Sequence, residues 1–371
     1  MSRLEFLDAG RAIAILGVIA VHTVGNFSTG INQLDFIIST GQFGVQLFFI
    51  ISAYTMFHTL VERETVEKRY IVNFWIRRYC RIAVPFWAGI VVYQGFRFAH
   101  VEYFVSTNSD WYSIISSIFL FQGFWPTSAS SIVPGGGSIA VEVIFYIVFP
   151  LIFLMRGSLT KVSLFGSLMI LLDQFVVREA YLEAFSLLDM NLSQQEIHQF
   201  FYYYFFNQFP VFLFGIFAYI FLNRKVGSKL SVVEGFSMPI FILCFMYFSP
   251  KIFIISLIGF LLLLGLVKIH HFPRWLLLVG KHSYSLYLFH FSVINIMLIA
   301  IGGRPTQHGI EVFIAAFCIA VSGSILVSLI AKPLLEDSGS ALGRLLVRNN
   351  ENRKGNRLDQ SQRNTSFFGR N

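Results

Sequence analysis

Charged residues are scarce in this sequence. Of its 371 residues, 13% are Asp, Glu, Lys or Arg, whereas 55% are hydrophobic and Phe alone occurs 43 times. A soluble domain usually carries about 25% charged residues. Because so few polar side chains cannot cover a water-soluble globule of this size, we expect an all-α, polytopic membrane protein.

Several familiar site patterns are also absent. The three cysteines are far apart and lie in or beside apolar runs, which excludes a disulfide framework and leaves them as small apolar fillers. No HExxH-like metal motif and no Gly-rich phosphate loop occurs, and we expect no metal. No internal repeat is detectable, which argues against many transporter folds.

Long apolar runs are what the sequence does contain. A membrane-spanning helix needs about 20 predominantly apolar residues. The segment 111–125 is shorter than that, and we expect it to stay at the outer surface. The remaining runs predict about ten transmembrane helices, at approximately 9–28, 38–60, 80–99, 138–155, 161–178, 199–222, 232–249, 252–268, 275–300 and 310–335.

The distribution of Lys and Arg predicts the orientation. If 111–125 does not cross, alternate loops collect the basic residues, while the opposite loops hold only Arg178, Lys251 and Arg304. The positive-inside rule then places both termini in the cytoplasm, and topology accounts for the net charge of +8 without a nucleic-acid partner. We expect a membrane-embedded domain over 1–336 and a polar, basic cytoplasmic tail over 337–371 that is disordered.

The first span contains an arginine and a histidine, Arg11 and His22. Eleven residues at about 100° each return to nearly the same face, about 16 Å further along the axis. Asp8 lies one turn before Arg11 and is expected to pair with it. Arg11 can also be a helix-end arginine reaching lipid headgroups, and His22 a buried structural imidazole. Titratable side chains within a span are nevertheless functional candidates.

This opening, Leu7-Asp8 followed by Arg-x10-His, resembles the first motif of the acyltransferase family 3 membrane proteins. Four further stretches resemble motifs of this family in the same order: FGVQLFFIISA (43–53), RRYCRIAVP (77–85), SIAVEVIFY (138–146) and GKHSYSLYLFH (280–290). Within these stretches, the sequence differs from the family's usual residues at Gln46, Ala53, Val143, Ile144 and Phe289.

The resemblance implies transfer of an acyl group, often acetyl, from cytosolic acetyl-CoA or another acyl-CoA to a hydroxyl. The acceptor would be a sugar, a glycolipid or an exported polysaccharide. The expected location is the cytoplasmic (inner) membrane of a bacterium, with the lipid bilayer and glycan-assembly enzymes as partners. Buried His, Arg and Glu side chains would also suit proton coupling, so a transporter or flippase for a glycan or lipid precursor is the alternative.

The donor end is expected at Arg77, Arg78 and Arg81, at the inner mouth of the third span. Their spacing makes a compact cluster on a helix, and arginine forks suit phosphate oxygens. Arg11 faces the same side and can join them. The alternative is that these arginines only anchor the loop on the cytoplasmic side.

His22 is the expected general base or nucleophile, since imidazole can play either part. Glu142 is expected to orient it if their helices are neighbours, because both lie near the outer ends of their spans; an interfacial Glu with its head in water is the alternative. The side chains expected to contact the substrate, or else to bond between helices, are Asp8, Ser52, Ser283, Tyr284, Ser285, Tyr287 and His290.

Overall fold

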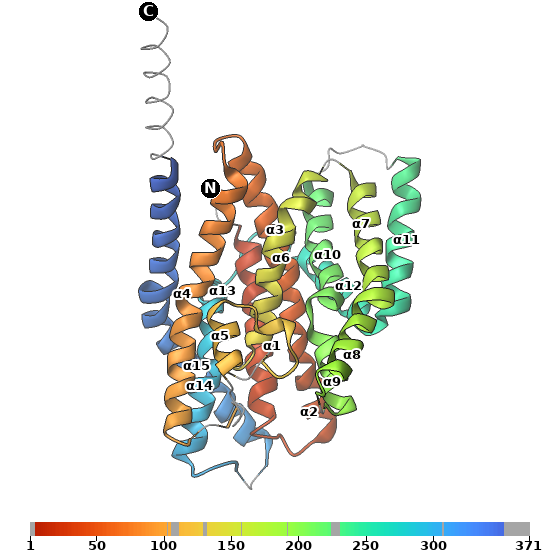
Figure 1. Cartoon of the computed structure of the whole chain (residues 1–371). Helices are drawn as coiled ribbons and strands as arrows, with labels where there is room; N and C mark the ends of the chain where they lie inside the picture. The colour runs from red at the N-terminus through yellow and green to blue at the C-terminus, as the bar shows by residue number, and fades with distance from the viewer. Residues whose placement is uncertain are drawn as a thin grey trace, which may run out of the picture.

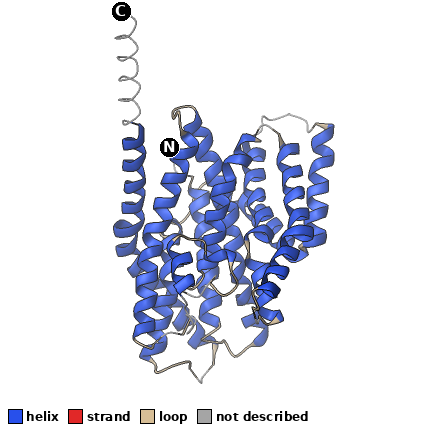
Figure 2. Ribbon diagram, in the orientation of Figure 1, coloured by secondary structure: helices blue, strands red, loops and turns tan. Residues whose placement is uncertain are grey.

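The computed structural model describes residues 4–101, 103–104, 111–128, 132–156, 158–190, 192–223, 231–305 and 308–351. Over these ranges the chain is helical and contains no β-strand (Figure 2). The all-α architecture predicted from the scarcity of charge and the long apolar runs is confirmed.

The helices form one upright bundle (Figure 1). Two short π-helical segments, Asp173–Val177 and Lys332–Asp337, lie within the long helical runs Leu159–Leu187 and Ile310–Glu351. The helices are α1 (Glu5–Val24), α2 (Asn32–Ser39), α3 (Gly44–Glu64), α4 (Tyr70–Phe98), α5 (Trp111–Ile118), α6 (Gly136–Leu154), α7 (Leu159–Leu172), α8 (Arg178–Leu187), α9 (Gln194–Tyr203), α10 (Phe205–Asn223), α11 (Val232–Phe248), α12 (Pro250–Val267), α13 (Arg274–Lys281), α14 (Ser283–Ala300) and α15 (Ile310–Ala331).

Among the described residues, eight helical runs are long and apolar enough to cross a membrane. They contain α1, α3, α6, α7, α10, α12, α14 and α15, each of which overlaps one predicted span. The other two predicted spans correspond to α4, whose 29 residues include several arginines, and to α11, which has 17 residues. The prediction of a multi-pass helical membrane protein is therefore confirmed.

The segment 111–125 contains only the 8-residue α5 and a short 3₁₀ turn, Gln122–Phe124. A helix of that length spans about 12 Å, which is too short to cross a bilayer. Two hydrogen bonds fix the segment to its neighbours: Trp87 Nε1 donates to the Ile118 carbonyl over 2.8 Å, and Gln122 Nε2 donates to the Gly136 carbonyl over 2.9 Å. The structure thus agrees with a non-crossing segment.

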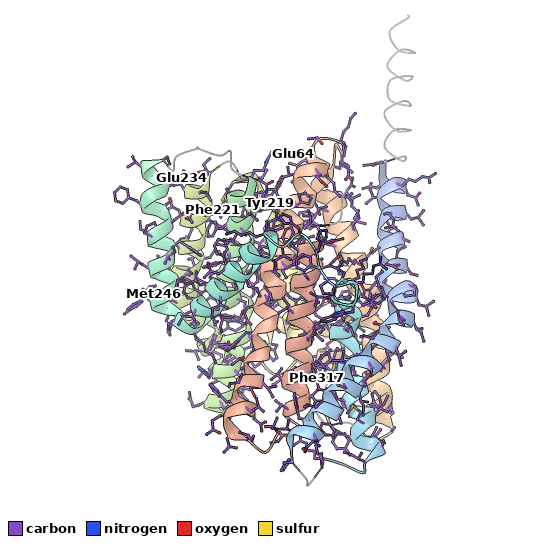
Figure 3. All side chains as sticks on the ribbon, turned by 180° about the vertical axis from the view of Figure 1, so that it is seen from behind. Glu64, Tyr219, Phe221, Glu234, Met246 and Phe317 are labelled. Atoms are coloured by element: carbon purple, nitrogen blue, oxygen red, sulfur yellow. The ribbon has the colours of Figure 1, made fainter. Side chains whose placement is uncertain are left out.

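The α3–α4 turn, residues 65–69, contains Lys68 and Arg69, and we call the end of the bundle at which it lies the basic end. Glu64 and Glu234 lie at this end, whereas Phe317 lies towards the opposite end (Figure 3). The last described residues also extend to the basic end (Figure 1). The first and last described residues therefore lie on the same side of the bundle centre.

The prediction of a disordered tail is wrong for its first part. Residues 338–351 form a continuous helix, here called the C-terminal helix. Gly339 packs so closely on α4 that an added Cβ would lie 2.4 Å from the Cys80 carbonyl oxygen. Asn73 of α4 donates from Nδ2 to Glu351 over 2.9 Å. The prediction depended on polar composition, but packing of this glycine against α4 favours a helix here. Residues 352–371 lie outside the described residues.

The centre of the bundle places α1 beside α3, α13, α14 and α15, and places α3 between α1 and α6. The contact of α1 with α13 is unusually close. An added Cβ at Gly280 would lie 1.9 Å from the Asp8 carbonyl oxygen, which is far inside van der Waals contact. Gly280 thus sets the position of α1 one turn before Arg11.

Gly280→Ala is expected to destabilise the protein by about 1–3 kcal/mol, because the methyl group forces α1 and α13 apart. The temperature at which half of the detergent-purified protein remains monodisperse on size exclusion should fall. Gly265→Ala in α12 is the matched control, because nothing lies within 4 Å of its added Cβ. Equal midpoints for the two variants would contradict this account of the helix contact.

Candidate active site

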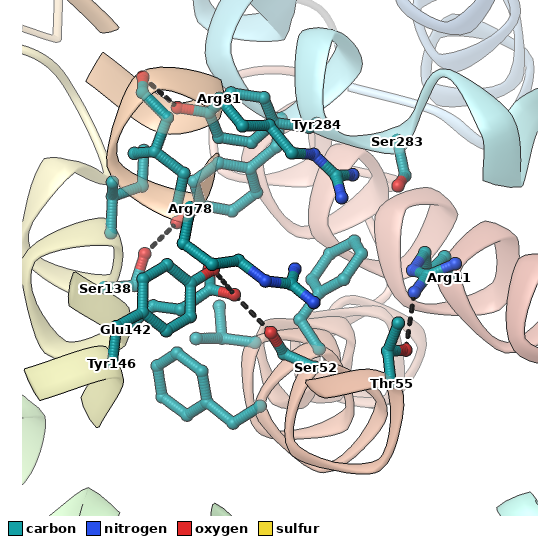
Figure 4. A pocket seen from close by; sticks show the side chains of 16 residues that line it. Arg11, Ser52, Thr55, Arg78, Arg81, Ser138, Glu142, Tyr146, Ser283 and Tyr284 are labelled. Carbon is teal, nitrogen blue, oxygen red and sulfur yellow. Dashed lines mark hydrogen bonds between the residues drawn. The ribbon is translucent and has the colours of Figure 1, made fainter. Parts of the chain in front are cut away.

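A polar cavity lies within the bundle, between α1, α3, α4, α6 and α14 (Figure 4). Its empty space, including the part open to solvent, is about 740 Å³. The apolar part of its wall includes Val45, Phe48, Phe49, Ile82 and Ile139. The polar part consists of Arg11, Ser52, Thr55, Arg78, Arg81, Ser138, Glu142, Tyr146, Ser283, Tyr284 and Tyr287.

Arg11 points from α1 into this cavity. Its Nη1 lies 3.2 Å from Asp8 Oδ1, and its Nη2 donates to Thr55 Oγ1 of α3 over 2.8 Å. The predicted pairing with Asp8, which is 2% exposed, is confirmed. Because its guanidinium is held by a neighbouring helix, Arg11 is not a lipid-facing arginine at a helix end.

Glu142 faces the same cavity from α6. Its Oε1 accepts hydrogen bonds from the Ser52 hydroxyl of α3 and from the Tyr146 hydroxyl, the latter over 2.6 Å. Figure 4 shows Ser52, Glu142 and Tyr146 together beside Arg78. The carboxylate is thus engaged inside the protein and does not extend into water at the membrane surface.

The three arginines of the predicted cluster on α4 have different surroundings. Arg78 and Arg81 line the cavity, and neither forms an ion pair with another described residue. The Arg78 guanidinium lies 5.8 Å from the centre of the Phe74 ring and 5.7 Å from that of Tyr146, at cation–π distance. These two arginines present positive charge to the cavity without a paired carboxylate.

Arg77 does not line the cavity. Its guanidinium forms an ion pair with Glu67, in the turn before α4, and Arg63 and Asn73 bond the same carboxylate at 2.7 and 3.0 Å. Although burial acts to raise it, these bonds, led by that from Arg77, hold the pKa of Glu67 below its ordinary value. The predicted cluster of three arginines is therefore divided, because a nearby carboxylate engages one of them.

His22 lies outside the cavity lining, against α14. Its ring centre is 5.3 Å from that of His290 and 4.3 Å from that of Phe291. Tyr287 connects this pair to the cavity: its ring lines the cavity, lies 6.0 Å from the His290 ring, and its hydroxyl is 2.6 Å from Ser138 Oγ. The two histidines thus lie directly next to a residue of the cavity wall.

The expected meeting of His22 with Glu142 does not occur. The prediction required α1 and α6 to be neighbours, but α3 lies between them and packs on both. Glu142 consequently bonds Ser52 of α3, at the cavity that Arg11 also lines, while His22 contacts α14. Depth along each helix could be estimated from the sequence, whereas the lateral order of the helices could not.

Of the remaining predicted residues, two line the cavity and one holds the helix that carries them. Ser283 and Tyr284 line the cavity, and the Tyr284 hydroxyl donates to the Ile82 carbonyl of α4 over 3.0 Å. Ser285 points away from it and bonds Glu336 through both its backbone N–H, over 2.9 Å, and its hydroxyl. Ser285 therefore fixes the start of α14 and does not contact the cavity.

Sequence reasoning missed three polar residues of the cavity wall, Thr55, Ser138 and Tyr146, and also Glu336, which lies behind the wall and bonds Ser285. Thr55 follows Ser52 by three residues and Tyr146 follows Glu142 by four, so helical spacing from the chosen residues would have found both. Glu336, 4% exposed, is a carboxylate directly after the last apolar run, which is itself an unusual position. Within the described ranges, no three His, Cys, Asp or Glu side chains gather as metal ligands.

The sequence of this chain is similar to those of known acyltransferases. A family profile described as an acyltransferase domain matches residues 4–331. The peptidoglycan O-acetyltransferase OatA of Listeria monocytogenes is 24% identical over 331 residues, covering 78% of this chain and 49% of that protein, so the chain spans about half the length of this relative. No solved structure matches the chain. Since the match includes every helix that forms the cavity, the chain belongs to acyltransferase family 3.

Proposed function

We propose that this protein transfers an acetyl group from acetyl-CoA to a hydroxyl of a cell-surface glycan, in the cytoplasmic membrane of a bacterium. The single observation that carries the proposal is the cavity in which Arg78 and Arg81, without paired carboxylates, lie beside the hydrogen-bonded Ser52 and Glu142. Family membership and the named activity of the bacterial relative support an acetyl group and a glycan acceptor.

The cavity suits the donor for electrostatic reasons. Coenzyme A carries several phosphate charges, and arginines that line a cavity without paired carboxylates can form strong, charge-assisted hydrogen bonds with an anionic ligand. Arg11, Arg78 and Arg81 approach the cavity from two helices, so they can bind separate phosphate oxygens. By the positive-inside rule the basic end faces the cytoplasm, where acetyl-CoA is found.

The reaction requires a base near the cavity. The acceptor oxygen attacks the thioester carbonyl, a C–O bond forms, the C–S bond breaks and coenzyme A leaves as a thiolate. His22 takes the hydroxyl proton and gives it to the departing thiolate, so that the imidazole ends neutral. Glu142 accepts hydrogen bonds from Ser52 and Tyr146 and so holds both hydroxyls in place at the cavity wall.

The proposal is tested with purified protein in liposomes, radiolabelled acetyl-CoA and soluble peptidoglycan fragments. We expect label to appear on the glycan as an ester that mild alkali releases. Incubation without acceptor should leave the protein unlabelled if His22 acts as a base. Movement of intact glycan across the liposome without any labelled ester would instead identify a flippase and overturn the proposal.

A further inference from the structure

His290 is a completely buried histidine with one ring nitrogen fully engaged. Its exposed fraction is 0%. Its Nδ1 lies 2.8 Å from the Tyr287 carbonyl oxygen and 3.1 Å from that of Leu286. Carbonyl oxygens only accept hydrogen bonds, so Nδ1 must carry the proton that it donates to them. In a neutral imidazole, the other nitrogen, Nε2, is then an acceptor.

That acceptor is unused. Nε2 of His290 is buried and has no hydrogen-bond partner among the described residues. A buried polar atom without a partner is costly, and it usually has a functional explanation when a native protein retains it. The neighbouring Phe291, whose ring centre lies 4.2 Å from that of His290, offers no donor.

His22 is a titratable side chain whose ring packs beside that of His290. Their rings are 5.3 Å apart, centre to centre, and tilted by 38°. Phe291 packs against the His22 ring as well, at 4.3 Å, and so restricts the orientations of both imidazoles. No hydrogen bond engages the His22 ring within the part of the chain that the structure describes. A small rotation of His22 would direct one of its ring N–H groups at Nε2 of His290.

We propose that His290 is the positioning residue for His22: its Nε2 accepts the N–H of one His22 nitrogen and thereby leaves the lone pair of the other nitrogen for the substrate. This role, which rests on the proposed function, is the one that sequence analysis gave to Glu142. The logic is that of a catalytic triad, in which the third residue fixes the tautomer and orientation of the base. Here the acceptor is a neutral imidazole from α14.

Two polar substitutions separate this role from a structural one. The amide of His290→Gln can place an oxygen near the position of Nε2, whereas that of His290→Asn reaches only the position of Nδ1. We expect His290→Asn to lower kcat for acetyl transfer about 100-fold with the acetyl-CoA KM unchanged, and His290→Gln to recover at least tenfold of that loss. His58→Gln, at a histidine beside Glu62 on α3, is the control and should leave kcat unchanged.

A double variant provides the decisive measurement. If His290 acts only through His22, the combination of His22→Ala with His290→Asn should be no slower than His22→Ala alone, because residues that act as a unit are not additive. Multiplied losses in the double variant, or equal rates for the Asn and Gln variants, would overturn the inference. Failure of the unaltered protein to transfer acetyl would instead overturn the proposed function, so the two failures are distinguishable.

Discussion

Replacing His22 by Ala is expected to lower kcat for acetyl transfer by about 10²- to 10⁴-fold, the usual contribution of a general base. The acetyl-CoA KM should stay near its original value, because His22 lies outside the cavity that we assign to the donor. The measurement is the initial rate of labelled ester formation in liposomes, over a range of acetyl-CoA concentrations. A loss of kcat at constant KM is the result of removing an interaction that is needed only for the chemical step.

The control for this variant is binding. His22→Ala should bind acetyl-CoA in calorimetry as tightly as the unaltered protein and should elute identically on size exclusion. A variant that binds the donor and keeps full kcat would remove His22 from the mechanism. A variant that loses donor binding would show that His22 belongs to the donor site, contrary to the present assignment.

Local features of the fold could be predicted from the sequence. Each membrane helix corresponds to an apolar run of about 20 residues, so its presence follows from composition alone. The pair Asp8–Arg11 follows from spacing, since side chains three residues apart are neighbours on a helix. The structure brings candidate residues from all five motifs to one cavity, among them Arg11, Ser52 and Glu142. Such side chains are costly in an apolar span unless something binds them, which is why they were candidates.

Features that depend on packing between helices could not be predicted. Whether His22 meets Glu142 depends on which helices are neighbours, and periodicity gives only depth and rotation. The engagement of Arg77 depends on where the α3–α4 turn places Glu67. The C-terminal helix depends on the fit of Gly339 against α4. In each case a partner distant in sequence, or in a turn of unpredictable shape, decided the outcome.

The unpaired positive charge of the cavity comes from Arg78 and Arg81. The positive charge of Arg77 is balanced by Glu67, and that of Arg11 by Asp8. Arg81 has no carboxylate within ion-pair distance among the described residues, and Arg78 faces Glu142 without forming a salt bridge with it. A cavity that retains such charges is suited to an anionic ligand, since arginine forms strong, charge-assisted hydrogen bonds with phosphate oxygens.

Replacing Arg78 by Ala is therefore expected to raise the acetyl-CoA KM about 10- to 100-fold, because a hydrogen bond to a charged group contributes about 1.5–3 kcal/mol. Arg78→Lys should recover only part of this loss, since an ammonium cannot bond two phosphate oxygens in the manner of a planar guanidinium. Calorimetric titration with acetyl-CoA, and with desulfo-CoA as a non-reacting analogue, measures the loss of affinity separately from any change in turnover.

Arg77→Ala is the matched control, because it removes the same charge one residue earlier in the same helix. Since its guanidinium is bound to Glu67 and not to the cavity, this variant should change the acetyl-CoA KM less than threefold while lowering thermal stability. Its stability loss should vanish at acid pH, because the pKa of Glu67 is depressed in the fold and the ion pair is lost as that carboxylate is protonated. Equal rises in KM for both variants would mean that donor binding reflects the general positive charge of the basic end; a rise confined to Arg78→Ala would place the donor phosphates in the cavity.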